Sequence, residues 1–175
     1  MKHRGWMVGI ALIAALAAGV GPATSSGVGR PIGMRATFTN LPASPENDII
    51  RYGHSPIVDT PKQIGKGASD PKKRYAGNDP ACKNCHLDAG LRPFAAPFVS
   101  TFATFPMLVD DQVITLKERI NGCMRRSMNG KNLPEDGPEM EALIAYIKFL
   151  GHGTPEGMRV AGMGLLPSRS AFGGG

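Results

Sequence analysis

One short motif constrains this chain more than any other feature of its sequence. Cys82, Cys85 and His86 form the pattern C-x-x-C-H. Two thiols this close together can each form a thioether with a haem vinyl group, and the next residue then places an imidazole at the iron. A zinc site would need a second pair of ligands, and a thioredoxin-like site would need a βαβ pattern; the sequence has neither. The motif therefore predicts one covalent haem c, with Cys82 and Cys85 as the thioether residues and His86 as the proximal iron ligand.

Residues 1–23 have the character of a secretory signal peptide. Lys2 and Arg4 precede a charge-free apolar run, and small residues at 21–23 provide a cleavage site. The run of roughly 14 residues is shorter than the roughly 18–20 needed to span a bilayer. We therefore expect export to the periplasm, with membrane attachment only if the signal stays uncleaved.

The charge of the chain limits the kinds of partner. Removing Lys2 and Arg4 with the signal lowers the formal net charge from +6 to +4. A mildly basic protein suits acidic redox partners or anionic substrates through electrostatic steering. Because no run of basic residues stands out, we expect no nucleic-acid binding.

Residues 44–151 are predicted to form the folded domain. A flexible lead at 24–43 precedes it, and a Gly- and Pro-rich tail at 152–175 follows it. A first helix is expected to begin at Ser44, as N-cap, and to end at Gly53. Residues 56–75 and 87–106 are expected to be loops. The second loop offers apolar side chains that would shield a bound group, namely Phe94, Phe98, Val99, Phe102 and Phe105.

Two further helices are expected downstream. Residues 115–127 begin with a capping box, Thr115 with Glu118, and carry Leu116, Ile120 and Met124 along one stripe. A second stripe at the same spacing holds Arg119, Cys123 and Ser127. Residues 136–150 follow, with Asp136 as the predicted cap, Gly151 as the stop and an apolar face of Met140, Leu143, Ile144, Ile147 and Leu150. With no convincing β pattern, we predict a mainly α, small cytochrome c fold wrapped around one covalent haem.

The residues alone leave the sixth iron ligand open. Met is a common ligand in cytochromes c, and Met128 is well placed. Cys123 is the cysteine outside the motif, and neighbouring arginines would favour its metal-binding thiolate. A free cysteine is also often a small buried hydrophobe. The candidates are Met107, Met124, Met128, Met140, Met158, Met163, His54, His152 and Cys123.

Three segments resemble a known family. They are Arg74–Asn78 (RYAGN), Cys85–Gly90 (CHLDAG) and Arg119–Gly130 (RINGCMRRSMNG). Together they resemble the haem domain of the tetrathionate-forming thiosulfate dehydrogenases, which are related to the A subunit of the Sox cytochromes. The similarity extends over about residues 44–166, and the third segment is the most specific.

The resemblance implies a haem with His and Cys axial ligands, so that Cys123 is the distal ligand and takes part in sulfur chemistry. It also implies that Arg119 and Ser127 hold the sulfonate end of thiosulfate. An arginine fork suits sulfonate oxygens. Coupling two thiosulfates releases two electrons while one haem accepts one, so the electrons would pass to a separate acceptor such as another cytochrome c.

Two departures from the family pattern keep the activity open. The sequence has no second C-x-x-C-H, and Met107–Asp111 stand where the family often has a Tyr-Arg pair. Acids near an anion site would weaken thiosulfate binding or shift the substrate. Three readings therefore remain: a thiosulfate dehydrogenase, an electron-transfer cytochrome without catalysis, and a subunit of a multi-haem complex.

Overall fold

The computed structural model describes residue 38 and residues 40–154. The predicted signal peptide, most of the predicted lead and most of the tail lie outside the described residues. Within the described part, no helix combines the length and apolar character needed to cross a membrane.

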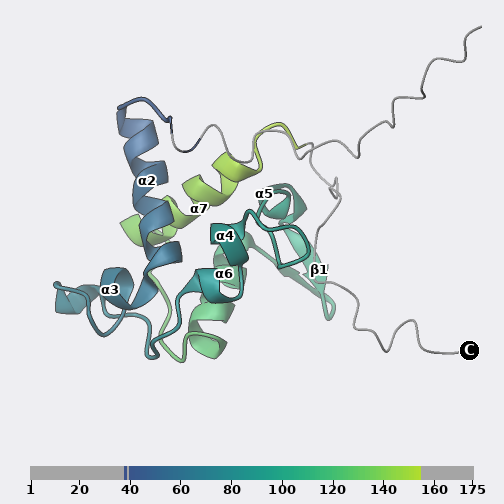
Figure 1. Ribbon diagram of the computed structural model, residues 1–175. Helices are drawn as coiled ribbons and strands as arrows, with labels where there is room; N and C mark the ends of the chain where they lie inside the picture. The colour runs from purple at the N-terminus through teal and green to yellow at the C-terminus, as the bar shows by residue number, and fades with distance from the viewer. Residues whose placement is uncertain (1–37, 39, 155–175) are drawn as a thin grey trace, which may run out of the picture.

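Two helices form the frame of the domain. α2 (Pro45–Val58) packs across α7 (Pro138–Leu150) (Figure 1). Ser44 caps α2 as predicted, since its side chain accepts a hydrogen bond from the amide of Asn47 at 3.2 Å. The predicted end at Gly53 is wrong. Gly53 instead marks the closest approach of the two helices, because an added Cβ there would lie 1.9 Å from the carbonyl oxygen of Ala142.

α7 confirms its predicted apolar face but not its predicted cap. Met140, Leu143, Ile147 and Leu150 are buried, while Ile144 is half-buried. The N-cap position is taken by Gly137, and the carboxylate of Asp136 instead accepts a hydrogen bond from Lys117 Nζ at 3.2 Å. The helix ends at Leu150, before Gly151, as expected.

The segment 56–75, predicted to be a loop, is partly helical. It contains the end of α2, then α3 (Thr60–Ile64) and the 3-10 turn η1 (Pro71–Lys73). The loop prediction is wrong because it treated every proline as a helix breaker. Pro61 and Pro71 lie in the first turn of their helices, where the missing N–H has no partner to lose. Pro56 lies inside α2.

The segment 87–106 is mostly irregular, as predicted. It contains only the short turns α4 (Leu87–Gly90) and α5 (Thr101–Thr104). Phe98 and Val99 are buried, and Phe102 and Phe105 are half-buried against the core. Phe94 departs from the expectation, because 46% of it is exposed.

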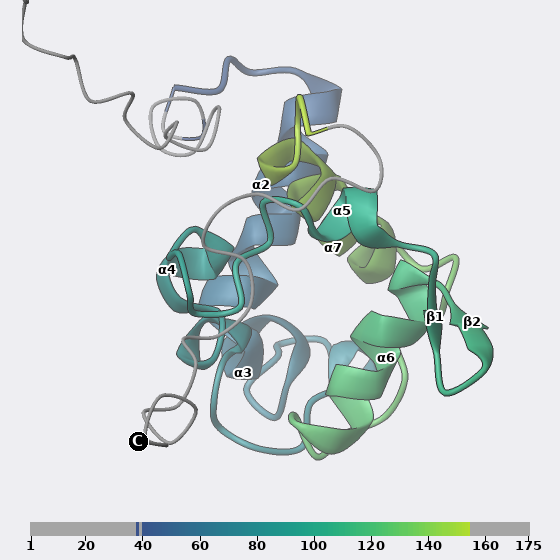
Figure 2. The same ribbon diagram turned by 90° about the vertical axis from the view of Figure 1, so that its right-hand side faces the viewer.

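A β-hairpin follows this segment, although the sequence indicated no strands. β1 (Met107–Val109) pairs antiparallel with β2 (Gln112–Ile114) (Figure 2). Strands this short contain too few residues to display an alternating pattern. Asp110 and Asp111 form the turn with φ of 48° and 62°. Asp tolerates positive φ, and a two-residue turn of this kind matches the twist of a hairpin.

α6 (Leu116–Arg126) confirms the predicted helix and its capping box. The hydroxyl of Thr115 accepts from the amide of Glu118 at 3.2 Å, and the carboxylate of Glu118 accepts from the amide of Thr115 at 2.7 Å. The described residues therefore form a mainly α domain with one small hairpin.

Candidate functional site

A cavity of about 1020 Å³ is bordered by α6, the β1–β2 hairpin and the loop that carries the cysteine motif. Its volume is at the upper end of the range of about 300–1,000 Å³ typical of ligand sites. The predicted haem-attachment, substrate and leading distal-ligand residues all line it: Cys82, Cys85, His86, Arg119, Cys123, Ser127 and Met128. Of the other candidate ligands, Met107 and Met124 also line it and His54, Met140 and His152 do not, while Met158 and Met163 lie outside the described residues.

One side of the cavity, which we call the proximal wall, consists of residues 82–98. It begins with the 3-10 turn η2 (Cys82–Asn84). The amide of Cys82 donates to the hydroxyl of Thr60 at 3.0 Å, and Thr60 is fully buried. Burial raises the pKa of the Cys82 thiol, and the Thr60 hydroxyl opposes that rise. Sequence reasoning missed Thr60, because nothing in the sequence indicates a contact across 22 residues.

His86 is held in one orientation on this wall. Its Nδ1 lies 2.6 Å from the carbonyl oxygen of Ala96, which can only accept, so Nδ1 carries the proton and Nε2 remains free to bind a metal. The ring of Phe98 lies 4.4 Å away, centroid to centroid. Burial lowers the pKa of His86, and the charge of Arg119 adds to the effect. Both favour the neutral imidazole that binds metals.

A strained turn follows His86. Asp88, Ala89 and Gly90 have φ of 53°, 54° and 87°. Glycine is required at position 90 for two reasons. Its φ lies in the left-handed region, and a Cβ there would lie 2.1 Å from a ring carbon of Phe98. From α7, Tyr146 Oη donates to the carbonyl oxygen of Ala89 at 3.0 Å. A side chain of α7 thus holds the turn that follows His86.

The other side, which we call the distal wall, consists of α6 and the turn to Lys131. The buried Asn121 anchors it: Nδ2 donates to the carbonyl oxygen of Leu133 at 3.1 Å, and Oδ1 accepts from the amide of Leu133 at 2.8 Å. This contact holds the helix against the segment that leads to α7.

A backbone contact joins the distal wall to the segment before the cysteine motif. The amide of Gly77 donates to the carbonyl of Met128 at 2.9 Å, and the amide of Lys131 donates to the carbonyl of Tyr75 at 2.9 Å. The two segments lie so close that a Cβ on Gly130 would be 2.1 Å from the Tyr75 oxygen. Two of the three sequence segments singled out above therefore pack against each other.

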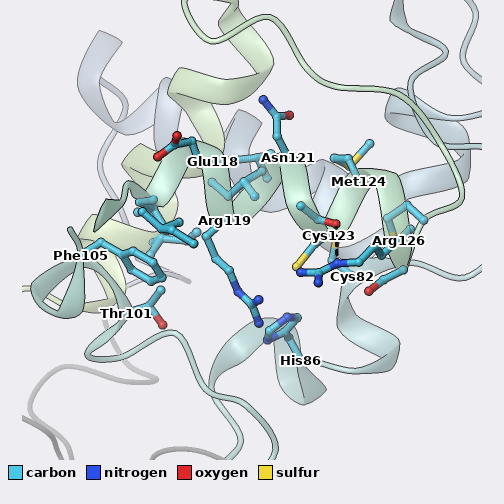
Figure 3. A pocket seen from close by; sticks show the side chains of 18 of the residues that line it. Cys82, His86, Thr101, Phe105, Glu118, Arg119, Asn121, Cys123, Met124 and Arg126 are labelled. Atoms are coloured by element: carbon cyan, nitrogen blue, oxygen red, sulfur yellow. Dashed lines mark hydrogen bonds between the residues drawn. The ribbon is translucent and has the colours of Figure 1, made fainter. Parts of the chain in front are cut away.

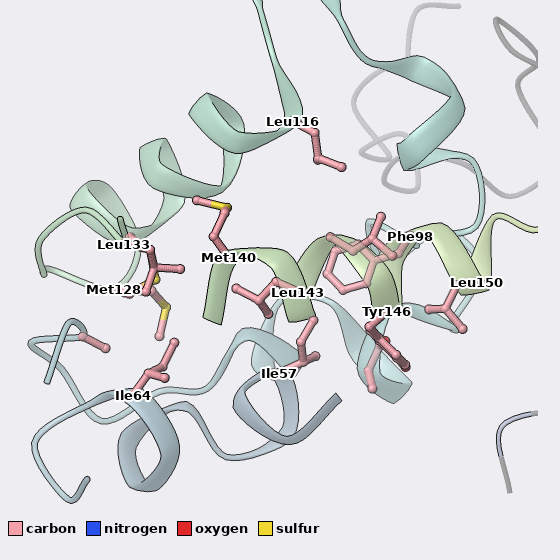
Figure 4. Close-up of a cluster of buried hydrophobic side chains, with 14 residues drawn as sticks. Ile57, Ile64, Phe98, Leu116, Met128, Leu133, Met140, Leu143, Tyr146 and Leu150 are labelled. Atoms are coloured by element: carbon pink, nitrogen blue, oxygen red, sulfur yellow. The ribbon is translucent and has the colours of Figure 1, made fainter. Parts of the chain in front are cut away.

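The two leading candidates for the sixth ligand lie in different surroundings. Cys123 is half-buried and borders the cavity on the distal wall, near Cys82 (Figure 3). Met128 also borders the cavity, but it is only 5% exposed and belongs to the hydrophobic core with Ile64 and Leu133 (Figure 4).

Arg119 brings positive charge into the cavity. Its side chain extends from α6 toward His86 (Figure 3), and it makes no side-chain hydrogen bond or ion pair with any residue that the structure describes. Arg125 is engaged instead, by the side-chain oxygen of Asn132 at 2.6 Å. Ser127 is exposed at the C-cap of α6, one turn beyond Cys123.

The residues that line the cavity fit haem c. Two thiols and a neutral imidazole stand on the proximal wall, and a thiol and a cation stand on the distal wall. Apolar side chains complete the lining, among them Ile57, Phe98, Leu116, Leu143 and Ile147. Haem would supply a one-electron redox centre here, and the guanidinium is suited to carboxylates or other anions. The fold and this site define a c-type cytochrome domain.

Comparison with known proteins identifies the family. Residues 67–155 match the family model described as SoxA/TsdA, cytochrome c domain. The chain belongs to this family, and its cytochrome c domain is of the type that binds haem c covalently.

Named relatives have similar sequences over most of this chain. A thiosulfate dehydrogenase of Thiomonas intermedia (strain K12) is 34% identical over 146 residues, which are 79% of this chain and 44% of the relative. One from Allochromatium vinosum is 34% identical over 131 residues, or 71% of this chain and 46% of the relative. This chain therefore spans less than half the length of these curated relatives.

A solved structure also resembles this domain. Thiosulfate dehydrogenase (TsdBA) from Marichromatium purpuratum, in its "as isolated" form, superposes with a TM-score of 0.65 and 31% sequence identity. The match covers 73% of this chain and 28% of that chain.

Proposed function

We propose that this protein is an exported c-type cytochrome with one haem, which transfers electrons in thiosulfate oxidation. Cys82 and Cys85 attach the haem, His86 is the proximal ligand and Cys123 is the distal ligand. One observation carries the proposal: the same cavity is bordered by the cysteine motif on one wall and, on the other, by Cys123 and by Arg119, whose side chain pairs with none of the described residues.

The different burial of the two sulfur residues supports Cys123 over Met128. Met128 packs with Ile64 and Leu133 in the core, so turning its thioether toward an iron would open a gap there. The Cys123 thiol already borders the cavity. A cysteine thiolate is the form that binds iron and acts as a nucleophile.

The distal wall supplies what an oxidation of thiosulfate requires. The Arg119 guanidinium binds the sulfonate oxygens, and the Ser127 hydroxyl donates a further hydrogen bond to them. The sulfane sulfur then faces Cys123. Joining two thiosulfates to tetrathionate releases two electrons, and a haem held by Cys82, Cys85 and His86 would accept them one at a time. A separate cytochrome c or similar acceptor therefore completes the reaction.

A second function has its own support. Asp110 lines the cavity and Asp111 follows it, where the family often has a Tyr-Arg pair. Like charges repel a doubly negative substrate. An electron-transfer cytochrome without catalysis, or a subunit whose partner completes the site, agrees with this observation.

An assay with the holoprotein separates these functions. We expect tetrathionate to form from thiosulfate with ferricyanide as acceptor, and Arg119→Gln to reduce kcat/KM by about 10²-fold, since a charged hydrogen bond to the substrate is lost. The matched control is Arg125→Gln, because that guanidinium is already engaged by Asn132. If the holoprotein has an intact low-spin haem and forms no tetrathionate, the thiosulfate dehydrogenase proposal fails and electron transfer without catalysis is the function that remains.

Spectroscopy tests the distal ligand independently of turnover. We expect an EPR spectrum of thiolate-ligated low-spin haem, and Cys123→Met is expected to raise the reduction potential because thioether replaces thiolate. The control is Met128→Leu, which keeps the core volume nearly constant. A methionine-type near-infrared band that Met128→Leu abolishes would contradict the assignment.

A further inference from the structure

The β1–β2 hairpin has two faces with different surroundings. Met107 pairs with Ile114 across the strands, and both line the cavity. Val109 and Gln112, the next pair on the same face of the strands, line it as well. Successive side chains of a strand point to opposite faces, so Leu108 and Val113 belong to the outer face. Leu108 does not line the cavity, whereas Val113 also borders it.

The outer face is apolar and open to solvent. Leu108 and Val113 are cross-strand partners, with exposed fractions of 66% and 67%. No other large hydrophobic residue in the described part of the chain is as exposed; the next is Ile49, at 48% on α2. An apolar cross-strand pair this exposed, on a hairpin next to a cofactor cavity, is a feature of interaction surfaces.

The tip of the hairpin is acidic. Asp110 and Asp111 form the turn, and neither makes an ion pair with any described residue. They are thus two uncompensated negative charges on a chain whose formal net charge is +6. The local charge is opposite to the charge of the whole chain, which orients a cationic partner toward this hairpin.

We propose that the outer face of the β1–β2 hairpin docks the electron acceptor, and that this acceptor is a small c-type cytochrome whose exposed haem edge is surrounded by lysines. Leu108 and Val113 contact the apolar centre of that surface, and Asp110 and Asp111 attract its lysines. One electron leaves the reduced haem of this protein and reduces the ferric haem of the partner. The proposal rests on the electron-transfer function proposed above.

The surface also accounts for the departure of Met107–Asp111 from the family pattern. An apolar pair and an acidic turn are poor features for binding thiosulfate, but they are complementary to a cationic protein. The same hairpin therefore borders the cofactor cavity on one face and receives the partner on the other.

Binding is tested with the holoprotein and a lysine-rich mitochondrial-type cytochrome c as the probe, by titration calorimetry at several salt concentrations. The variants are Leu108→Ser and Asp111→Asn, which do not line the cavity. Asn tolerates the positive φ of 62° at position 111, so the turn is retained. The matched controls are Ile49→Ser, an exposed apolar residue on α2, and Asp79→Asn.

We expect Leu108→Ser to raise Kd about 10-fold at every salt concentration. Asp111→Asn is expected to raise it about 3-fold at low salt and to flatten its salt dependence. The controls should leave Kd unchanged. Equal effects of the hairpin and control variants would overturn the proposal, as would sedimentation showing that the exposed pair holds a second copy of this chain.

A second readout separates this proposal from the proposed thiosulfate activity. Ferricyanide needs no docking surface. The Leu108→Ser variant, once treated with thiosulfate, should therefore reduce ferricyanide at the unchanged rate. The same variant should transfer electrons to the cytochrome c probe more slowly. If thiosulfate gives no reduction at all, dithionite-reduced protein still reports transfer to the probe. Loss of that transfer in the variant would support the docking surface even where the substrate assignment fails.

Discussion

The two walls of the cavity are built by different means. The distal wall is a regular helix, α6, with a capping box at its start and an apolar stripe toward the core. The proximal wall is largely irregular and contains three consecutive residues at positive φ, Asp88 to Gly90. Local signals in the sequence therefore predict the helix that bears Cys123, whereas the turn after His86 depends on contacts with distant residues such as Tyr146.

The largest effect is expected where the distal wall meets the segment before the cysteine motif. Gly130→Ala would place a Cβ 2.1 Å from the backbone oxygen of Tyr75, which cannot move aside alone. We expect a loss of about 3 kcal/mol in the free energy of unfolding, measured by denaturant titration. In the control Gly67→Ala the nearest atom is 3.3 Å away, so the loss should be below about 1 kcal/mol. Equal losses would show that the contact is not tight.

A somewhat smaller effect is expected on the proximal wall. Gly90→Ala combines a φ of 87° with a contact of 2.1 Å to Phe98, whose side chain can rotate. We expect a loss of about 2–3 kcal/mol, together with an altered reduction potential because the Phe98 ring packs on His86. An unchanged potential in a folded variant would mean that the turn does not position the imidazole.

The next test returns to the distal wall. Asn121→Ala leaves the buried amide and carbonyl of Leu133 without partners, and we expect a loss of about 2 kcal/mol in unfolding free energy. Asn132→Ala removes only an exposed contact to Arg125 and should cost below about 0.5 kcal/mol. Similar costs for the two variants would refute the anchoring role of Asn121.

Tyr146→Phe tests the link between the frame and the proximal wall. It removes the hydrogen bond to Ala89 and leaves the ring in place, so the expected loss is about 1 kcal/mol. Hydrogen exchange should speed up at residues 86–91 and stay unchanged in α6. Uniform acceleration across both walls would contradict a local link.

The smallest effect concerns the frame that both walls share. Burial would raise the pKa of Glu139, but hydrogen bonds from Lys73 and Tyr52 outweigh it and hold this pKa below its usual value. The pKa of Glu139 is lower in the folded state than the reference value of 4.5 for the unfolded chain. The ionised Glu139 therefore stabilises the fold fully above pH 4.5, and this stabilisation is lost as the pH falls through the folded pKa. In Glu139→Gln, the free energy of unfolding should depend less steeply on pH in the acid range. An unchanged slope would show that the ionised Glu139 does not stabilise the fold through Lys73 and Tyr52.

The two walls also differ in how well the sequence predicts them. The stripe of Arg119, Cys123 and Ser127 and the start of α6 follow from helical periodicity and a local capping box. The hairpin escaped prediction because three-residue strands show too little alternation. The sequence pattern predicted Gly53 as a helix end. Its role is to let α7 approach α2 closely, and a local pattern cannot show this tertiary contact.

Covalent attachment of a haem to the proximal wall is the central claim, and mass spectrometry of the exported holoprotein tests it most directly. We expect the mass of a single haem to be added to the mature chain and to be found, after proteolysis, on the peptide that contains Cys82 and Cys85. Cys82→Ala with Cys85→Ala should remove that mass. A chain exported without added mass, or with the haem on another peptide, would contradict the account.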